Sequence, residues 1–561
     1  MPETPSEPTQ VYAFAEEAWD AFLAHEPLWA TAQGDERFDD RLDDPGPEGR
    51  AANLALVDGW DAELDRLEAT ETSVEDGITL GLIRVVGERF RRGHELRTWD
   101  MEAIAQYGGP QGLIGDLARV QRVDSPDRIE RLISRLHAYP DWLDAHAANL
   151  EVGVAAGRTA AVPVVERCIT QTRRIVESPP EEAPLLVAHP ELDAGDRARI
   201  EEVIRAEVLP AQRRWLTMLE GYAEHARRDV GIGHVPDGEA LYRHHIRSWT
   251  TLEEDPRDIH EFGLARLDEI EHEARAIARD LGHDDIGELR RFLDADPANH
   301  ADEPGRLVTL AEELIERADA EAPTWFGRLP RAGCEVRPVE AHVEQEAPPA
   351  FYMPPAPDGS RKGIYYINTF DPASRPLHRI AATTFHEAVP GHHFQITIEQ
   401  ELSGVPSFRR FGARLAGGAY VEGWGLYAER LAAEMGLYPT PLERFGALES
   451  EAWRAVRLVV DTGIHALGWD RRRSIEMLIE RAGLSTLEAD TETDRYISWP
   501  GQALSYMIGQ REIMSLRAEL EARDGDRFDR RGFHDQVLAH GALPLATLRA
   551  QLPQWVEPLA G

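Results

Sequence analysis

The sequence predicts a mainly α-helical protein with a small β element, and three observations indicate this. Apolar residues recur every three or four positions over long stretches of the chain. Strand-like alternation is almost absent before residue 330. The 561 residues, of which 42% are hydrophobic, are enough for a large core with two or more layers or lobes.

The first 330 residues are expected to form one helical lobe, and residues 331–561 a second one that carries the functional site. We find no repeat with a period of about 20–50 residues, which argues against a helical solenoid. The helical segments expected from apolar spacing are 11–29, 50–70, 74–96, 126–150, 162–177, 196–228 and 256–282.

The best strand candidate is 363–369, which is rich in β-branched and aromatic residues and follows a proline-rich stretch. Two interpretations are open. The segment is either a strand at the edge of the site that pairs with an extended peptide, with Tyr366 and Asn368 among the substrate-binding residues, or a structural hairpin.

The stretch 384–395 is the part of the sequence most typical of catalysis. It places His386, Glu387, His392 and His393 within eight residues. Two histidines that hold a metal and a glutamate that takes a proton from metal-bound water are the groups used in zinc-assisted hydrolysis.

The spacing departs from the usual H-E-x-x-H pattern, because Pro390 stands four residues after His386. Six residues of straight helix rise about 9 Å. Two imidazoles that share a zinc need nitrogens within about 4 Å of each other. Pro390 and Gly391 therefore predict a bulge or break that makes His392 the better second ligand and His393 its neighbour. The alternative is a helix end that is polar by chance.

A helix is expected over 414–434, and it supplies two further carboxylates. Glu422 is the candidate third ligand. Glu429, seven residues on and on the same face, is either a partner of a ligand or a surface charge. Gly423 and Gly425 lower helix propensity, which indicates close packing against a neighbouring helix.

Two later helices complete the candidate site. The helix 447–466 carries charged residues in an apolar setting, which predicts buried ion pairing, and its Asp461 is expected to orient a zinc-bound imidazole. A final helix, with Pro500 near its first turn, carries Gln502 and Tyr506 at i and i+4. The Tyr506 hydroxyl either stabilises an oxyanion or is part of the core.

The net charge of −39 argues against nucleic acid and anionic membranes as partners. Lys362 is the only lysine, and arginine supplies the other basic residues. This composition is typical of a salt-adapted (halophilic) protein, although an acidic bacterial protein with arginine-biased codons is the alternative. The two cysteines, Cys168 and Cys334, imply no disulfide framework. A polar N-terminus and the lack of a long apolar run predict a cytoplasmic location.

Together these segments resemble the bacterial and archaeal family called domain of unknown function number 885. The family in turn resembles helical zinc peptidases such as thimet oligopeptidase and Taq-type carboxypeptidases, which implies two helical lobes around a deep cleft. Gly425 departs from the pattern, where alanine is more usual. The segments that carry the resemblance are 30–35, 108–111, 363–368, 386–395, 422–429, 454–465, 500–506 and 533–545.

We therefore expect a zinc-dependent metallopeptidase that cleaves short peptides, with zinc on His386, His392 and Glu422 and with Glu387 as the base. A metal-dependent amidase or esterase and an inactive helical binding protein are the alternatives, and the oligomeric state is not predicted. The other expected site residues are Tyr506 and His465 for the oxyanion, His393, Glu429 and Asp461 around the ligands, and Tyr366, Asn368, Arg495, Gln502 and Arg511 for substrate. Of the last group, either Arg495 or Arg511 is expected to hold a substrate carboxylate, because a guanidinium group suits that role.

The acidic composition generates a first prediction. Salt screens the repulsion between surface carboxylates, so the melting temperature should rise from low to molar KCl. Thermal unfolding followed by circular dichroism measures this. A melting temperature that stays flat over that range would remove the salt-adapted interpretation.

Overall fold

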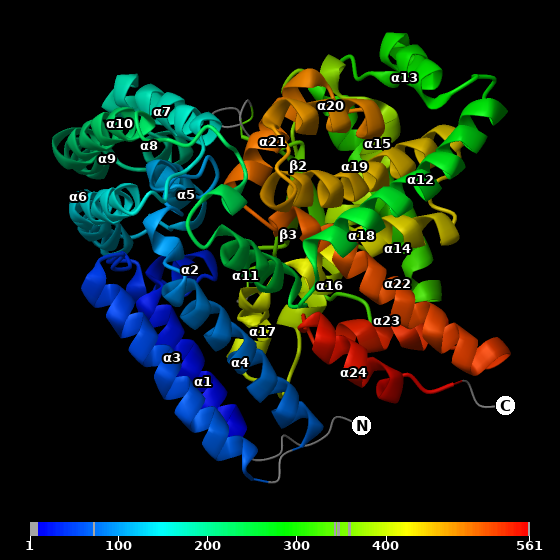
Figure 1. Ribbon diagram of the computed structural model, residues 1–561, viewed down its shortest axis with the longest axis horizontal. Helices are drawn as coiled ribbons and strands as arrows, with labels where there is room; N and C mark the ends of the chain where they lie inside the picture. The colour runs from blue at the N-terminus through cyan, green and yellow to red at the C-terminus, as the bar shows by residue number, and fades with distance from the viewer. Residues whose placement is uncertain are drawn as a thin grey trace.

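The computed structural model describes residues 9–70, 73–340, 344, 348–356, 359 and 361–558. The first eight residues of the polar N-terminal segment lie outside this part of the chain. Helices build most of the described chain, as predicted (Figure 1). In the described ranges, no helix is both long and apolar enough to cross a membrane.

Two of the expected segments before residue 330 are interrupted, 11–29 at Glu26 and 196–228 by a π-helical turn, Ile204–Val208. The helices here otherwise cover the expected segments. They are α1 (Gln10–His25), α2 (Pro27–Ala32), α3 (Pro47–Glu68), α4 (Val74–Glu95), α5 (Leu113–Val120), α6 (Pro126–Ala155), α7 (Val162–Glu177), α8 (Pro184–Ala188), α9 (Ala194–Val203), α10 (Leu209–Ala223), α11 (Gly238–Thr250), α12 (Pro256–Asp280), α13 (Ile286–Ala295) and α14 (Pro304–Trp325).

The second half holds three strands followed by the helices that build the candidate site. They are β1 (Cys334–Pro338), β2 (Ala350–Met353), β3 (Gly363–Ile367), α15 (Leu377–Glu387), α16 (His392–Gln400), α17 (Ser407–Phe411), α18 (Ala419–Glu434), α19 (Pro441–Ala466), α20 (Arg471–Ala482), α21 (Thr486–Ser498), α22 (Ser505–Asp524), α23 (Arg530–Ala539) and α24 (Leu545–Trp555).

Contacts cross the expected boundary at residue 330. Helices α12 and α14 precede it, yet α12 packs along α19 and α14 packs against α15. In Figure 1 both helices lie with the C-terminal elements, on the side of the molecule opposite α6 to α10. The described core is likewise one cluster of buried apolar residues that spans both halves, plus a small second cluster on the sheet.

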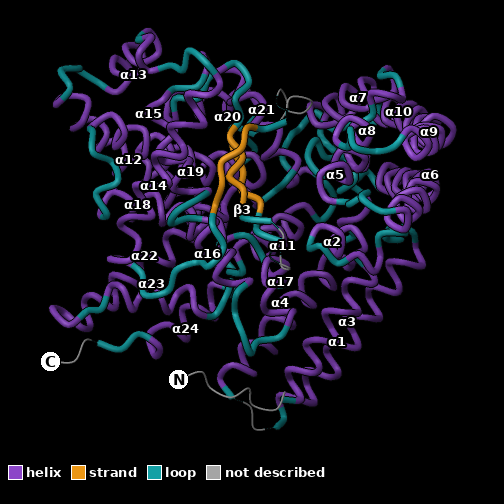
Figure 2. Tube along the Cα trace, turned by 180° about the vertical axis from the view of Figure 1, so that it is seen from behind, coloured by secondary structure: helices purple, strands orange, loops and turns teal. Residues whose placement is uncertain are grey.

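The strand prediction is confirmed, and of its two interpretations the structure favours the structural hairpin. β3 is the central strand of a three-stranded sheet, parallel to β1 and antiparallel to β2 (Figure 2). Both of its edges are already paired, so it cannot add a peptide strand. The exposed Lys362 directly precedes it.

The close packing expected from glycines in the 414–434 segment is confirmed for Gly423. Helix α18 crosses α22 there: a Cβ on Gly423 would lie 2.4 Å from Cα of Gly509, and a Cβ on Gly509 would lie 1.8 Å from the carbonyl oxygen of Ala419. Only glycine allows two helix backbones to approach this closely. The crossing fixes the position of Tyr506 on α22 relative to the carboxylates of α18.

The crossing generates a second prediction. Gly509→Ala must push α18 and α22 apart, and overpacking of this kind costs roughly 1–3 kcal/mol or more. Denaturant unfolding measures the loss. The matched control is Gly59→Ala, at an exposed position inside α3 where a Cβ meets no atom within 4 Å. That change should stabilise the protein by about 0.5–1 kcal/mol, because alanine favours the helix. Equal effects of the two changes would contradict the close crossing.

Candidate metal centre

The predicted helix break lies at the centre of the site. Helix α15 ends at Glu387 and α16 begins at His392, and the peptide bond between Val389 and Pro390 is cis. The indole Nε1 of Trp424, on α18, donates a hydrogen bond to the carbonyl oxygen of Pro390 at 2.9 Å. The break is therefore attached to the helix that carries the two further carboxylates.

Gly391 allows the chain to turn sharply enough for the second histidine to return to the first. A Cβ at this position would lie 1.9 Å from the carbonyl oxygen of His386 and 2.4 Å from that of Phe385. No other residue fits such a contact with backbone. The glycine therefore permits the fold that the histidine spacing requires.

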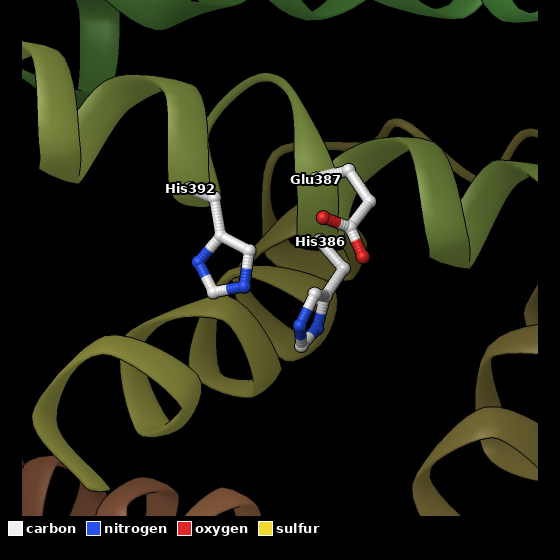
Figure 3. Close-up of side chains that lie close together, drawn as sticks. All are labelled: His386, Glu387 and His392. Atoms are coloured by element: carbon white, nitrogen blue, oxygen red, sulfur yellow. The ribbon is translucent and has the colours of Figure 1, made fainter. Parts of the chain in front are cut away.

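His386, His392 and Glu422 converge across this break. The two imidazole rings lie 4.6 Å apart, nearly perpendicular to each other. Oε2 of Glu422 lies 3.5 Å from Nε2 of His386 and 3.4 Å from Nε2 of His392. Figure 3 shows the two histidines and Glu387 gathered between the helix ends.

Glu387 is the second carboxylate at the two imidazoles. One of its oxygens lies within 4.8 Å of a nitrogen of His386 and of His392. It is therefore close enough to act at the same centre, while Glu422 makes the shorter approaches to both rings. Among the described residues, His386, Glu387 and His392 form a group of donors that could hold a metal ion.

Glu429 fixes the orientation and tautomer of His386. Nδ1 of His386 donates to Oε1 of Glu429 at 2.8 Å, which leaves Nε2 directed toward Glu422. Burial disfavours the charged imidazole, but hydrogen bonds to Glu422 and Glu429 outweigh it and raise the pKa of His386 to about 10. The surrounding carboxylates thus favour positive charge at this point. Of the two roles left open for Glu429, the structure favours the partner of a ligand.

His386 packs directly on the backbone of α18. A Cβ added to Gly425 would lie 2.8 Å from Cε1 and Nε2 of the His386 ring. The departure from alanine at this position therefore lets the imidazole lie closer to the helix. This contact accounts for the second glycine that lowers helix propensity in the segment.

His393 points away from the other donors, which decides between the two candidate ligands. Its Nδ1 lies 2.8 Å from the hydroxyl of Tyr352 on β2 and 3.3 Å from that of Thr397. Burial lowers the pKa of His393 to about 4, so the ring is neutral. His393 thus attaches the sheet to α16, and His392 faces His386.

Asp461 and His465 are placed elsewhere than expected. Asp461 accepts hydrogen bonds from the Tyr242 hydroxyl at 2.6 Å and from the backbone N–H of Gly501 at 3.1 Å. It therefore holds the turn before α22 instead of orienting an imidazole. Both ring nitrogens of His465 bond to backbone, Nδ1 to the N–H of Ile232 and Nε2 to a carbonyl oxygen. With its donors and acceptors occupied, His465 is not available to an oxyanion.

Tyr506 lies beside His386. Its ring is stacked on His386 with centroids 6.1 Å apart, and the side chain is 9% exposed. Arg495 donates to Oε1 of Gln502 at 2.6 Å. Gln502 lies on a 3₁₀ turn before α22, so its expected place on the same helix as Tyr506 is wrong.

Three residues expected to bind substrate have other partners. Tyr366 stacks on Phe351 of the neighbouring strand at 4.8 Å. The side-chain nitrogen of Asn368 donates to the carbonyl oxygens of Glu344 and Pro348, so this amide holds a loop.

Arg511 binds Glu254 through two hydrogen bonds, the one from Nη1 at 2.9 Å and the other from Nη2 at 2.5 Å. A guanidinium group that is already paired with a carboxylate in this way has its charge neutralised. Arg511 is therefore not a free receptor for a substrate carboxylate.

The sequence interpretation missed the roles of Trp424 and Arg454. Trp424 holds the helix break, and Nη2 of Arg454 lies 3.7 Å from Oε1 of Glu429. Arg454 did give a signal, because a charged residue within an apolar helix predicts buried ion pairing. Trp424 gave none, since an indole in a buried helix is ordinarily only part of the core.

One known protein family matches almost the whole chain. The family described as "Bacterial protein of unknown function (DUF885)" matches residues 27–552. The chain belongs to this family. The match confirms the resemblance drawn from the motifs, while the further likeness to zinc peptidases stays a prediction. No curated protein matches the chain.

Solved structures share the fold. A structure from Colwellia psychrerythraea, described as a "putative lipoprotein", is 26% identical with a TM-score of 0.89, over 97% of this chain and 98% of that one. A structure from Shewanella oneidensis, described as a "putative lipoprotein of unknown function", is 20% identical with a TM-score of 0.76, over 97% and 100%. These descriptions concern those proteins, and the cytoplasmic location expected here stays a prediction.

The contact between His386 and Glu429 generates a third prediction. Glu429→Gln weakens the hydrogen bond that orients the imidazole, so zinc affinity should fall about 10–100-fold. Competition with a chromophoric chelator measures the affinity. Asp461→Asn is the control. Because Asp461 contacts Tyr242 and Gly501 and not His386, the zinc affinity of this variant should stay unchanged. If Asp461→Asn lost zinc affinity and Glu429→Gln kept it, Asp461 would be the residue that orients the imidazole.

Proposed function

We propose that the protein is a zinc-dependent hydrolase, namely a metallopeptidase that cleaves short peptides. One observation carries the proposal: a single oxygen of Glu422 approaches Nε2 of both His386 and His392 at 3.4–3.5 Å. Ligand atoms that share a tetrahedral zinc with bonds of 2.0–2.1 Å are separated by about 3.4 Å. The distances from Glu422 to the two histidines are thus those expected of ligands that share one ion.

The chemistry of the donors also fits a cation. Two imidazole nitrogens and a carboxylate oxygen are the donors that zinc prefers in hydrolases. The carboxylates around His386 raise its pKa, so the site favours positive charge even without an ion. His386, His392 and Glu422 would hold the zinc, which when bound would supply a Lewis acid that polarises a carbonyl and acidifies water.

The residues of the chain would divide the remaining work. Glu387 accepts a proton from the attacking water and passes it to the leaving amine. Glu429 keeps the proton of His386 on Nδ1. Tyr506, whose ring is stacked on His386, would donate a hydrogen bond from its hydroxyl to the developing oxyanion. Water is thereby added across the C–N bond, as the acyl carbon gains the hydroxyl group and the amine gains the proton.

The experiment that tests the function separates Glu387 from Glu422. The purified protein should carry about one zinc per chain, and His386→Ala should lose it. Glu387→Gln should keep the zinc but lose at least 10²–10⁴-fold in peptide hydrolysis, roughly the contribution of a general base. Glu422→Gln should instead weaken zinc binding. Metal analysis and peptide hydrolysis measure the two effects.

Other outcomes would overturn these assignments. If Glu387→Gln lost its zinc and Glu422→Gln kept it, Glu387 would be the ligand and Glu422 the general base. Full zinc retention in His386→Ala would place the metal elsewhere. If peptides resist hydrolysis while non-peptide amides or esters are cleaved, the alternative hydrolase replaces the peptidase. If the protein carries no metal and cleaves none of these, the inactive binding protein replaces both.

A further inference from the structure

Two buried arginines and a partly buried one lie at or next to Tyr506. The guanidinium carbon of Arg457 lies 4.4 Å from the centroid of the Tyr506 ring, and that of Arg454 lies 6.0 Å from it. Arg495, near the end of α21, shares the carboxylate of Glu492 with Arg457. We call Arg454, Arg457 and Arg495 the arginine cluster.

The charge of the arginine cluster exceeds that of its carboxylate partners. Glu492 accepts from Nη2 of Arg457 at 3.2 Å and also from Nη1 of Arg495. The other nearby carboxylate, Glu429, lies 3.7 Å from Arg454 and already accepts from His386. Three guanidinium groups therefore share two carboxylates, one of which also serves a histidine.

The arginine cluster also has more donors than acceptors. Among the described residues, Nη1 of Arg457 and Nε of Arg454 are buried and lack any hydrogen-bond partner. A buried charge without a partner is costly to keep. Surplus buried donors and surplus positive charge in one place suit an anion that arrives from outside.

We propose that the arginine cluster receives the C-terminal carboxylate of a peptide, so that the protein removes residues from free C-termini. This inference rests on the proposed peptidase function and names its substrate class. A planar guanidinium fork binds a carboxylate through two parallel hydrogen bonds, which is the strongest form of this contact.

The position of the arginine cluster sets where the chain would be cut. It lies one side chain away from the metal ligands, since Tyr506 stacks on His386 and Glu429 lies between His386 and Arg454. One residue of extended chain spans only about 3.3–3.6 Å. A carboxylate held at the cluster therefore brings one of the last peptide bonds to His386 and His392.

Arg495 is the member that a ligand would meet first. Its side chain is 15% exposed, whereas those of Arg454 and Arg457 are 10% and 4% exposed. Its Nη2 bonds to Oε1 of Gln502, a neutral acceptor. A carboxylate that displaces this amide gains a charge-assisted hydrogen bond in its place. Arg495 therefore determines specificity in this proposal.

Binding measured without turnover tests the proposal. Glu387→Gln protein is titrated by calorimetry with N-acetyl-dialanine and with its C-terminal amide, at fixed ionic strength because salt screens the pair. The acid should bind at least tenfold more tightly than the amide. Adding Arg495→Met should weaken the binding of the acid to the affinity of the amide and leave the affinity for the amide unchanged. Equal binding of the two probes, or equal loss of both, would overturn the proposal.

Two further variants keep the test interpretable. Arg511→Met removes an arginine of α22 that Glu254 already neutralises, so the preference for the acid should survive. Loss of the preference in this control would remove the assignment to Arg495. Arg495→Lys keeps the charge and loses the fork, so it should retain part of the preference even if Arg495→Met does not fold. If both Arg495→Lys and Arg495→Met kept the full preference for the acid over the amide, the proposal would be overturned.

The products of hydrolysis separate this inference from the proposed function. Mass spectrometry should show residues released from the C-terminus of an unblocked peptide and at least tenfold slower cleavage of its amidated form. Internal cleavage at equal rates for both forms would overturn the C-terminal specificity and leave the peptidase standing. Zinc-loaded protein that binds the acid preferentially but cleaves neither peptide would support the arginine cluster as a carboxylate site and overturn the peptidase.

Discussion

The close approach of Gly391 to the carbonyl oxygen of His386 is the constraint on which the site depends. A continuous helix would place His392 on another face and well along the axis. The break returns it to the first histidine, and the indole of Trp424 holds the break against α18. Because α18 also carries Glu422, the contact that shapes the turn and the carboxylate that completes the donor set move together as one packed unit.

Much of the fold and of the inner site could be predicted from the sequence, since each rests on local rules. Apolar spacing gives the helices, and β-branched residues give β3. Pro390 and Gly391 cannot continue a helix, so the break follows from their backbone chemistry. The preference for His392 over His393 followed from counting residues across that break, and in the structure the ring of His392 lies beside that of His386.

The outer parts of the site could not be predicted, because spacing along a helix gives a face but not the neighbour that covers it. Asp461 and Glu429 are both carboxylates on buried helix faces, and only the packing decides which one meets His386. Arg495 and Arg511 were equally plausible as receptors for a carboxylate. Glu254, far away in the sequence, neutralises Arg511. Arg495 instead shares Glu492 with Arg457, and its bond to the neutral amide of Gln502 is one that it can exchange.

The single lysine has a practical consequence for this protein. Lys362 is exposed and directly precedes β3, whose first residue, Gly363, lies against the ring of His393. Apart from the chain's amino terminus, an amine-reactive fluorophore therefore has one place to attach. That place is joined to the sheet that contacts α16 through Tyr352 and His393. The composition thus provides a natural point for a spectroscopic reporter close to the helix break, without the introduction of a cysteine.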